Sequence, residues 1–154
     1  MNISFDLDGT LIPLNKEFST EKLNWFGHLL RVEKIREGSI DLITKLHNDG
    51  HTINVYTTSF RTKFKIRKTF KYYGIAINKI VNQAENIKAL NSININSSKY
   101  PPLFNFDVHI DDSRGVGVEG LKHNFKTIII DSSDKDWFNS IEDAINKIQN
   151  KNAQ

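Results

Sequence analysis

Two carboxylates, Asp6 and Asp8, stand one residue apart directly after a short β-prone segment, residues 3–5. In an extended backbone alternate side chains point to the same side, so both carboxylates can face one point from the end of a strand. Two negative charges this close repel each other unless a cation lies between them or one carboxylate holds a proton. The pair therefore indicates a metal site, acid–base chemistry, or both. The simplest alternative is a turn that only ends a strand.

Two more polar clusters follow β-prone segments further along the chain. Thr57 and Thr58 follow one such segment, and Asp111 and Asp112 follow another. A threonine hydroxyl can donate a hydrogen bond to a phosphoryl oxygen without adding a charge, and carboxylates are ligands that Mg²⁺ prefers. Such strand ends also serve as turns and helix N-caps, and Thr58 or Ser59 is a candidate cap.

The alternation of β-prone and helical segments predicts an α/β fold built from βαβ units. The expected strands cover residues 3–5, 52–56, 79–82, 106–110 and 126–130. Helices are expected within residues 20–36 (N-cap Ser19 or Thr20), 40–48, 61–73 and 84–91, and after a cap at 132–134, with a loop at 91–98. These elements predict a single Rossmann-like, doubly wound domain with a mostly parallel five-stranded sheet flanked by helices. Ligands bind such sheets beyond the carboxyl ends of the strands, so the three polar clusters should converge on one rim.

The 154 residues correspond to one domain of ordinary size, expected to span residues 1–150 with a frayed tail at 151–154. Residues 11–37 leave room for a flap and one short helical excursion, so no large cap domain is expected. The absence of cysteine excludes disulfides and thiolate metal sites. No apolar stretch approaches membrane-spanning length, and no basic leader precedes the first strand, so a cytoplasmic protein without a membrane partner is expected.

Residues 6–11 read Asp-Leu-Asp-Gly-Thr-Leu, a string that resembles the first signature of the haloacid dehalogenase-like (HAD) phosphohydrolases. The resemblance implies that Asp6 is a nucleophile that becomes an aspartyl-phosphate. It implies that Asp8 protonates the leaving group and later activates water. It also implies a Mg²⁺ cofactor, with Asp6 and Asp8 among the metal residues. Asp8 argues against the dehalogenase branch of the family, which does not keep this carboxylate.

Residues 55–59 are similar to the second HAD signature, an apolar strand that ends in a phosphate-binding Thr or Ser. The resemblance implies phosphate contacts from Thr57 and Thr58, with Thr57 the first choice. The third signature is a lone lysine that neutralises charge beside the phosphate. Lys99 is favoured because a Tyr-Pro sequence follows it, as in the family's Lys-Pro context, and Lys88 is the reserve candidate.

Residues 109–113 read His-Ile-Asp-Asp-Ser and resemble the fourth signature in its Asp-Asp form. The resemblance implies that Asp112 is the metal ligand and Asp111 its partner, although the two roles can be reversed. Longer forms of the signature carry a further acid at positions that correspond to Val116 and Gly117, so here the pair must supply the carboxylates itself. The histidine that opens the segment is expected to be a packed strand residue.

The positive charge of the chain is local. Residues 61–73 hold six basic side chains and no acidic one, while the whole chain has a net charge of only +3. Arg61, Lys65 and Lys68 are expected on one side of the helix, where they could guide phosphate-rich ligands, including polynucleotides, to the rim. The alternative is an ordinary solvated helix face.

The resemblance thus implies a Mg²⁺-dependent phosphatase that works through an aspartyl-phosphate on Asp6, with Asp8 as general acid and base. The phosphorylated substrate is not identified. Because no large cap domain is expected to cover the site, the site should be open and would admit a large substrate. Two alternatives stay open: a nucleic-acid end-processing phosphatase that uses residues 61–73, and a non-catalytic module that binds Mg²⁺ or phosphate for regulation.

Overall fold

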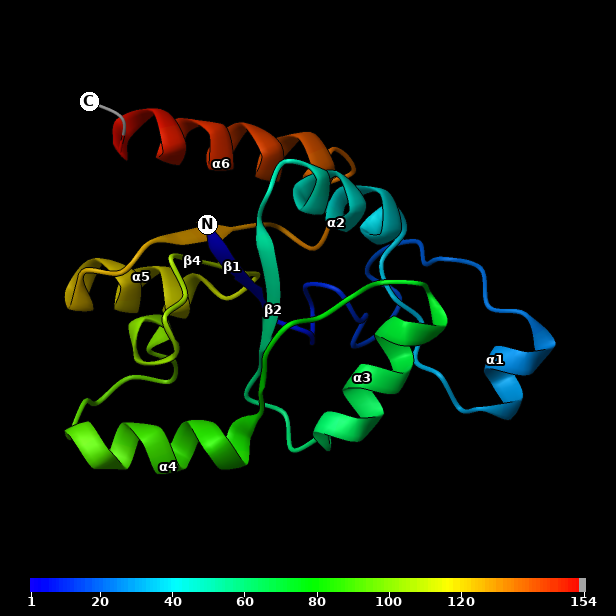
Figure 1. The fold of residues 1–154 in the computed structure, drawn as a ribbon, viewed down its shortest axis with the longest axis horizontal. Helices are drawn as coiled ribbons and strands as arrows, with labels where there is room; N and C mark the ends of the chain where they lie inside the picture. The colour runs from blue at the N-terminus through cyan, green and yellow to red at the C-terminus, as the bar shows by residue number, and fades with distance from the viewer. Residues whose placement is uncertain (153–154) are drawn as a thin grey trace.

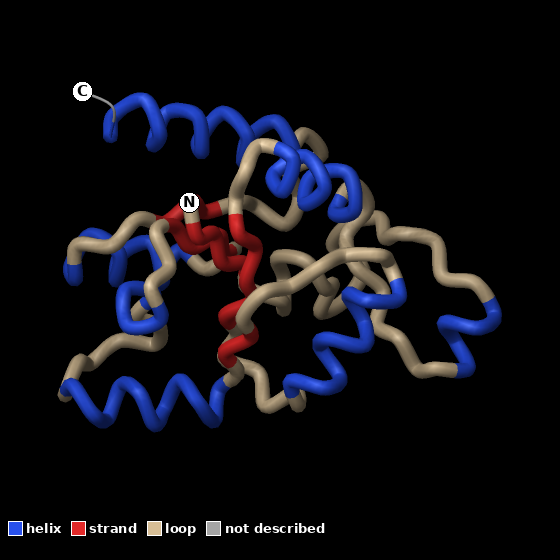
Figure 2. Tube along the Cα trace, viewed as in Figure 1, coloured by secondary structure: helices blue, strands red, loops and turns tan. Residues whose placement is uncertain are grey.

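The structure is a computed structural model that describes residues 1–152, and it contains a five-stranded sheet. All strand pairs are parallel, and the strands lie in the order β3-β2-β1-β4-β5. The strands are β1 (Asn2–Phe5), β2 (Thr52–Tyr56), β3 (Ile80–Val81), β4 (Val108–Asp111) and β5 (Thr127–Ile129). Figure 1 shows the helices around this sheet, and Figure 2 shows the strands in red at the centre. The predicted α/β fold with a five-stranded parallel sheet is confirmed.

β1 lies at the centre of the sheet, and the direction in which successive strands are added to the sheet reverses there. From β1 the chain moves outward to β2 and β3, and then crosses back to the other side of β1 for β4 and β5. The carboxyl ends of β1 and β4 therefore lie side by side where the connecting segments diverge. In open parallel sheets this switch point is the usual place for a ligand.

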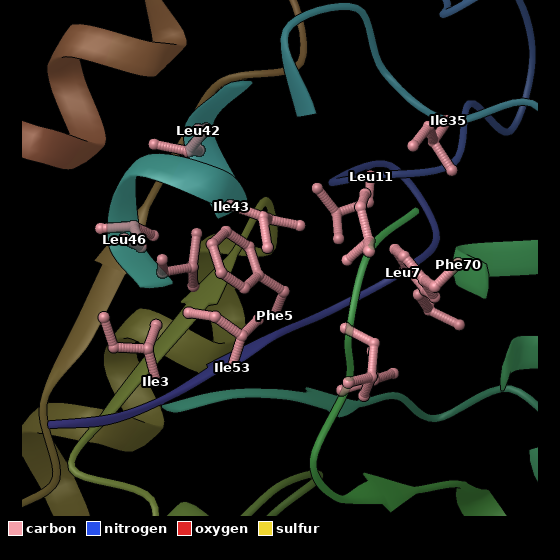
Figure 3. Packing of buried hydrophobic residues seen from close by; sticks show 14 of the residues in the cluster. Ile3, Phe5, Leu7, Leu11, Ile35, Leu42, Ile43, Leu46, Ile53 and Phe70 are labelled. Atoms are coloured by element: carbon pink, nitrogen blue, oxygen red, sulfur yellow. The ribbon is translucent and has the colours of Figure 1, made fainter. Parts of the chain in front are cut away.

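The main core lies between the sheet and three helices. These helices are α2 (Ser39–Asn48), α3 (Lys63–Tyr72) and α6 (Trp137–Asn152). Figure 3 shows Phe5 of β1 and Ile53 of β2 packed against Leu42 and Ile43 of α2, and all four side chains are at most 1% exposed. Each such side chain contributes about 1.5–3 kcal/mol through burial. This core fixes the central strands, and with them the residues that follow them.

Three helical elements follow the outer strand β3 and the strand β4. They are α4 (Gln83–Ile93), the 3₁₀ helix η1 (Pro101–Phe104) and α5 (Arg114–His123). Figure 1 shows α4 on the side of the molecule opposite α2 and α6. A second apolar cluster lies there, in which the Tyr56 ring meets the rings of Phe104 and Phe106 at centroid distances of 5.2 and 6.0 Å. Neither η1 nor α5 was expected from the sequence.

The glycines of α5 explain why this helix was not predicted from the sequence, because glycine lowers helix propensity. They are explained by the close approach of α5 to β5. A Cβ added at Gly120 would lie 3.0 Å from the Phe125 carbonyl oxygen, and one at Gly117 would lie 2.9 Å from Cγ1 of Ile129. The tertiary contact with the edge strand thus requires the residues that the local pattern disfavours.

The prediction of a helix across residues 20–36 was largely wrong. The structure has only α1 (Trp25–Leu29), whose N-cap is Asn24 rather than Ser19 or Thr20. Trp25 and Leu29 are 75% and 68% exposed, so the apolar spacing does not correspond to a buried face that would stabilise a longer helix. The rest of residues 11–37, here called the excursion, is irregular chain, and no cap domain is formed by it.

Two helix ends also differ from the prediction. α4 continues to Ile93, into the segment predicted as a loop, and stops where Asn94 adopts a left-handed backbone conformation. α6 extends through Asn152, so residues 151–152 of the predicted frayed tail are helical, while residues 153–154 lie outside the described part of the chain. Within residues 1–152, no helix combines the length and the apolar character needed to cross a membrane.

Candidate active site

Three carboxylates meet at the carboxyl ends of β1 and β4. Asp6 follows β1, Asp111 ends β4 and Asp112 comes next, and one oxygen from each lies within 4.8 Å of the others. The parallel pairing sets this geometry, because Phe5 is opposite Ile110 and the Asp6 N–H donates to the Ile110 carbonyl at 2.9 Å. The structure therefore brings together three of the four predicted metal residues.

Lys99 lies between two of these carboxylates. Its Nζ is 2.7 Å from Asp6 Oδ1 and 2.6 Å from Asp111 Oδ2, and the residue is only 2% exposed. Lys88, the reserve candidate, is exposed on α4. The structure thus places Lys99, and not Lys88, in the carboxylate cluster, although the two were hard to separate in the sequence.

The segment around Lys99 is fixed by neighbouring side chains. The Tyr100 N–H donates to the Tyr56 hydroxyl at 2.8 Å, and the side-chain amide of Asn86 donates to the Ser98 carbonyl at 2.8 Å. The carboxylate of Glu119 on α5 accepts from both the N–H and the hydroxyl of Ser98. These bonds join the segment to β2, α4 and α5, so the buried ammonium is held in a defined position.

The pKa values of Asp6 and Asp111 move in opposite directions. Burial raises the pKa of Asp6 to about 6, the Lys99 charge opposes this rise, and the Asp111 charge adds to it. Burial also acts against ionised Asp111, but the hydrogen bond from His109 and the Lys99 charge outweigh it and lower the Asp111 pKa. Asp111 is thus the ionised partner of Lys99, whereas Asp6 is the one of the two whose pKa is raised.

The three-carboxylate cluster has the donor set expected for Mg²⁺. Asp6 Oδ1 is buried and has no hydrogen-bond partner, because Lys99 approaches it at ion-pair distance without the angle of a hydrogen bond. Carboxylate oxygens are hard ligands, and Mg²⁺ binds through a few of them together with water and phosphate oxygens. The three clustered carboxylates carry more negative charge than the Lys99 ammonium balances, which fits such an ion, with Asp6 and Asp112 the more open ligands.

Asp112 is connected to the turn that follows β1. Thr10 Oγ1 donates to Asp112 Oδ1 at 3.1 Å, and a Cβ at Gly9 would collide with the Asp112 carboxylate. Gly9 also has φ +79°, a backbone conformation that side chains disfavour. Burial and the Asp111 charge raise the pKa of Asp112, although the Thr10 hydrogen bond opposes the rise. The glycine of the first motif therefore allows the β4 carboxylate to approach β1.

The Asp8 side chain is not part of the carboxylate cluster. Its Oδ2 accepts a hydrogen bond from Arg61 Nη1 at 2.7 Å, and Arg61 Nε donates to both carboxylate oxygens of Glu33, at 2.9 and 3.0 Å. Lys65 Nζ lies 3.3 Å from the same Glu33 carboxylate. Asp8 was predicted both as a metal residue and as the general acid and base. Its position beside the cluster corresponds better to the second role.

Thr57 directly follows β2 at the same rim and is 1% exposed, whereas Thr58 is exposed to solvent. Thr57 Oγ1 accepts a hydrogen bond from the Ser59 N–H at 3.1 Å. Its hydroxyl hydrogen has no acceptor within residues 1–152, so it can donate to a ligand. The N-cap of α3 is Thr62, not Thr58 or Ser59 as the sequence suggested, because Thr62 Oγ1 accepts from the Lys65 N–H.

No functional role was predicted for His109, and Ser4 was not singled out in the sequence. His109 is fully buried, with Nδ1 2.9 Å from Ser4 Oγ and Nε2 3.0 Å from Asp111 Oδ2. Burial, together with the Lys99 charge, lowers the pKa of His109 to about 4, so the ring is neutral at pH 7. Polar residues inside two apolar central strands, with a histidine two positions before Asp111, were the available signal.

The basic side chains predicted to attract nucleic acid are mostly engaged with the protein itself. Arg61 and Lys65 pair with Asp8 and Glu33, and Lys68 Nζ donates to the Leu30 carbonyl at 2.6 Å. These contacts reduce the free positive charge on this side of α3. Binding of nucleic acid by this helix stays a prediction.

No family model matches the chain, and no curated protein matches it. The functional interpretation therefore depends on the geometry of the site and on its chemistry.

Proposed function

We propose that this protein is a Mg²⁺-dependent phosphomonoester hydrolase of the HAD type, with Asp6 as the nucleophile. The observation that carries the proposal is the cluster of buried Asp6, buried Asp111 and half-buried Asp112 beside Lys99, with 2.7 and 2.6 Å between its ammonium and the first two carboxylates. The cluster lies at the switch point of a parallel sheet, where a ligand is expected. A purely structural site would not need three carboxylates around one lysine, because burying unbalanced charge is costly.

The carboxylates would hold the metal ion and the phosphate between them. Mg²⁺ bound by Asp6 and Asp112 would neutralise the phosphate charge that otherwise repels the nucleophile. Lys99 supplies a second positive charge beside Asp6, and the Thr57 hydroxyl can donate to a phosphoryl oxygen. Asp111 keeps Lys99 charged and in place, because it is the lysine's second partner.

The reaction then proceeds in two steps. In the first, an Asp6 carboxylate oxygen attacks phosphorus, the bond to the ester oxygen breaks, and Asp8 gives its proton to the departing alcohol. In the second, Asp8 takes a proton from water, which attacks phosphorus and releases phosphate while Asp6 is restored. Asp8 lies two residues from the nucleophile and outside the carboxylate cluster, which suits a group that must exchange protons with the leaving group and with water.

The direct test is phosphate release from p-nitrophenyl phosphate, measured with and without Mg²⁺. Asp6→Asn should abolish release, because an amide is not a nucleophile for this step, and the loss should be at least about 1,000-fold since a covalent route is removed. Asp143→Asn is the matched control, because Asp143 is exposed on α6. Full activity of Asp6→Asn would contradict the mechanism. Mg²⁺ binding without turnover of any phosphate ester would instead favour the non-catalytic module.

A further inference from the structure

Arg61 occupies a position that the mechanism above does not explain. It lies in the segment between β2 and α3, and its guanidinium joins Asp8 to Glu33 of the excursion. Its carbonyl accepts from Asn82 Nδ2 at 3.0 Å, which anchors the backbone of this segment to the start of α4. The residue is therefore held firmly, while its side chain stays 19% exposed at the rim.

The guanidinium has donor capacity left over. Nη1 donates to Asp8 and Nε donates to Glu33, whereas Nη2 has no protein partner within residues 1–152. Arginine presents its donors in a planar fork that matches carboxylate and phosphate groups in a bidentate way. With Glu33 holding Nε, a ligand anion can bind Nη2 and displace Asp8 from Nη1.

The place of Arg61 relative to the reaction decides which part of a substrate it can reach. In the proposed function Asp8 gives its proton to the leaving-group oxygen, so the leaving group must lie against Asp8. Arg61 Nη1 is 2.7 Å from Asp8 Oδ2, whereas Lys99 and the three-carboxylate cluster lie around Asp6. Arg61 would therefore lie beside the leaving group, and Lys99 would lie beside the transferred phosphoryl group.

We propose that Arg61 determines substrate specificity: the site takes phosphate monoesters whose leaving group carries a second anionic group, a carboxylate or a phosphate, close to the ester oxygen. This inference rests on the proposed function. On binding, Nη1 exchanges the Asp8 carboxylate for the substrate anion, Nη2 adds the second bond, and Glu33 keeps the guanidinium oriented. Asp8 is released to the ester oxygen at the same moment, which links recognition of the substrate to availability of the general acid.

The test compares three phosphate esters on the same two-carbon frame that differ in the second anionic group. Ethyl phosphate carries none, and 2-phosphoglycolate carries a carboxylate on the same two-carbon frame. Ethylene glycol bisphosphate supplies the phosphate arm of the comparison. We expect kcat/KM to favour the two esters with a second anionic group over ethyl phosphate by about 10- to 100-fold, the range of a charge-assisted bidentate contact. The stronger of the two responses identifies the anion that the site prefers.

Variants then assign the preference to Arg61. Arg61→Gln should bring the ratio between 2-phosphoglycolate and ethyl phosphate close to one, Arg61→Lys should restore part of it, and Lys71→Gln, exposed on α3, should leave it unchanged. Equal losses for all three esters in Arg61→Gln would overturn the proposal, as would a wild-type protein with no preference.

A binding measurement separates this inference from the proposed function. Calorimetric titration of the wild-type protein and Arg61→Gln with the same three compounds requires no turnover. Loss of the anion preference in the variant supports the role of Arg61 even if no ester is hydrolysed, a result that would overturn only the phosphatase. Identical affinities of both proteins for all three compounds would overturn the role of Arg61 even if hydrolysis is observed.

Discussion

At the scale of single residues, the most informative group is the chain of contacts from Ser4 through His109 to Asp111 and Lys99. A neutral imidazole has one donor and one acceptor nitrogen, so His109 can accept from the Ser4 hydroxyl at Nδ1 and donate to Asp111 at Nε2. The donated bond keeps Asp111 ionised, and ionised Asp111 holds the Lys99 ammonium beside Asp6. The environment of Asp6, the proposed nucleophile, is thus set in part by two buried residues, Ser4 and His109, that act through Asp111.

The raised pKa of Asp6 leads to a prediction for the pH dependence of activity. A nucleophile must be ionised, and Asp6 is protonated below its pKa of about 6, so kcat/KM should rise as pH increases through this range. At low Mg²⁺ the midpoint should lie near pH 6, and it should fall as Mg²⁺ increases, because the cation favours the ionised carboxylate. Initial rates from pH 4.5 to 8 at several Mg²⁺ concentrations measure both effects.

A substitution beside Asp6 provides the control for this profile. Asp111→Asn removes a negative charge that contributes to the raised pKa, so the midpoint should move to lower pH, whereas Asp143→Asn should not move it. A rate that is constant from pH 4.5 to 8 in the wild-type protein would show that ionisation of Asp6 does not limit the reaction.

At the scale of elements, the turn after β1 connects the two halves of the site. The Leu7 carbonyl accepts from the N–H groups of Thr10, Leu11 and Ile12, so the chain curls tightly immediately after the strand. This curl requires the left-handed conformation of Gly9 and places Thr10 against Asp112. The motif therefore contributes carboxylates and also positions Asp112, the residue that follows β4.

Gly9→Ala should harm both stability and metal binding. The left-handed conformation alone costs a side chain about 1–2 kcal/mol, and the added methyl group would also push Asp112 away. Gly50→Ala is the matched control, because Gly50 has nearly the same φ, +80°, but nothing within 4 Å of its would-be Cβ. Urea unfolding and Mg²⁺ titration should show the backbone cost in both variants and loss of Mg²⁺ affinity only in Gly9→Ala. Equal Mg²⁺ affinities would separate Gly9 from the site.

Two arginines attach the excursion to the rest of the domain. Arg61, outside the excursion, pairs with Glu33 near the end of the excursion. Arg36, inside the excursion and only 2% exposed, donates from Nη2 to three backbone carbonyls within residues 131–134. The guanidinium of Arg36 lies between the rings of Phe18 and Trp137, at 4.5 and 4.6 Å from their centroids. Aromatic stacking and hydrogen bonds replace the helix that apolar spacing had predicted here.

The parts of the site that could be predicted are those fixed by local pattern and sheet topology. Asp6, Thr57 and Asp111 each end or follow a parallel strand, so their convergence could be predicted from the sequence. The contacts of Arg61 could not be predicted, because no periodicity relates positions 8, 33 and 61, and only the tertiary fold brings them together. α5 was missed for a similar reason, since its glycines serve a contact with β5.

At the scale of the whole molecule, the carboxylate cluster exists only in the folded chain. Asp6 and Asp112 are more than 100 residues apart in sequence and are brought together by the pairing of β1 with β4. The unfolded chain therefore has no comparable Mg²⁺ site. An ion that binds the cluster must stabilise the fold as a whole, by an amount that grows with the logarithm of the ratio between its concentration and its dissociation constant.

Mg²⁺ should accordingly raise the thermal stability of the protein. The gain should be about 1.4 kcal/mol for each tenfold excess of Mg²⁺ over its dissociation constant, or roughly 3–6 °C in Tm for a chain of this size. Scanning calorimetry with 0.1–20 mM MgCl₂ measures the shift, and KCl at matched ionic strength controls for screening. Asp112→Asn should lose most of the shift while Asp143→Asn keeps it, because only the first removes a ligand of the cluster. A Tm that follows ionic strength alone would exclude a Mg²⁺ site of millimolar affinity, whereas a shift that needs Asp112 would establish the cation site without reference to catalysis.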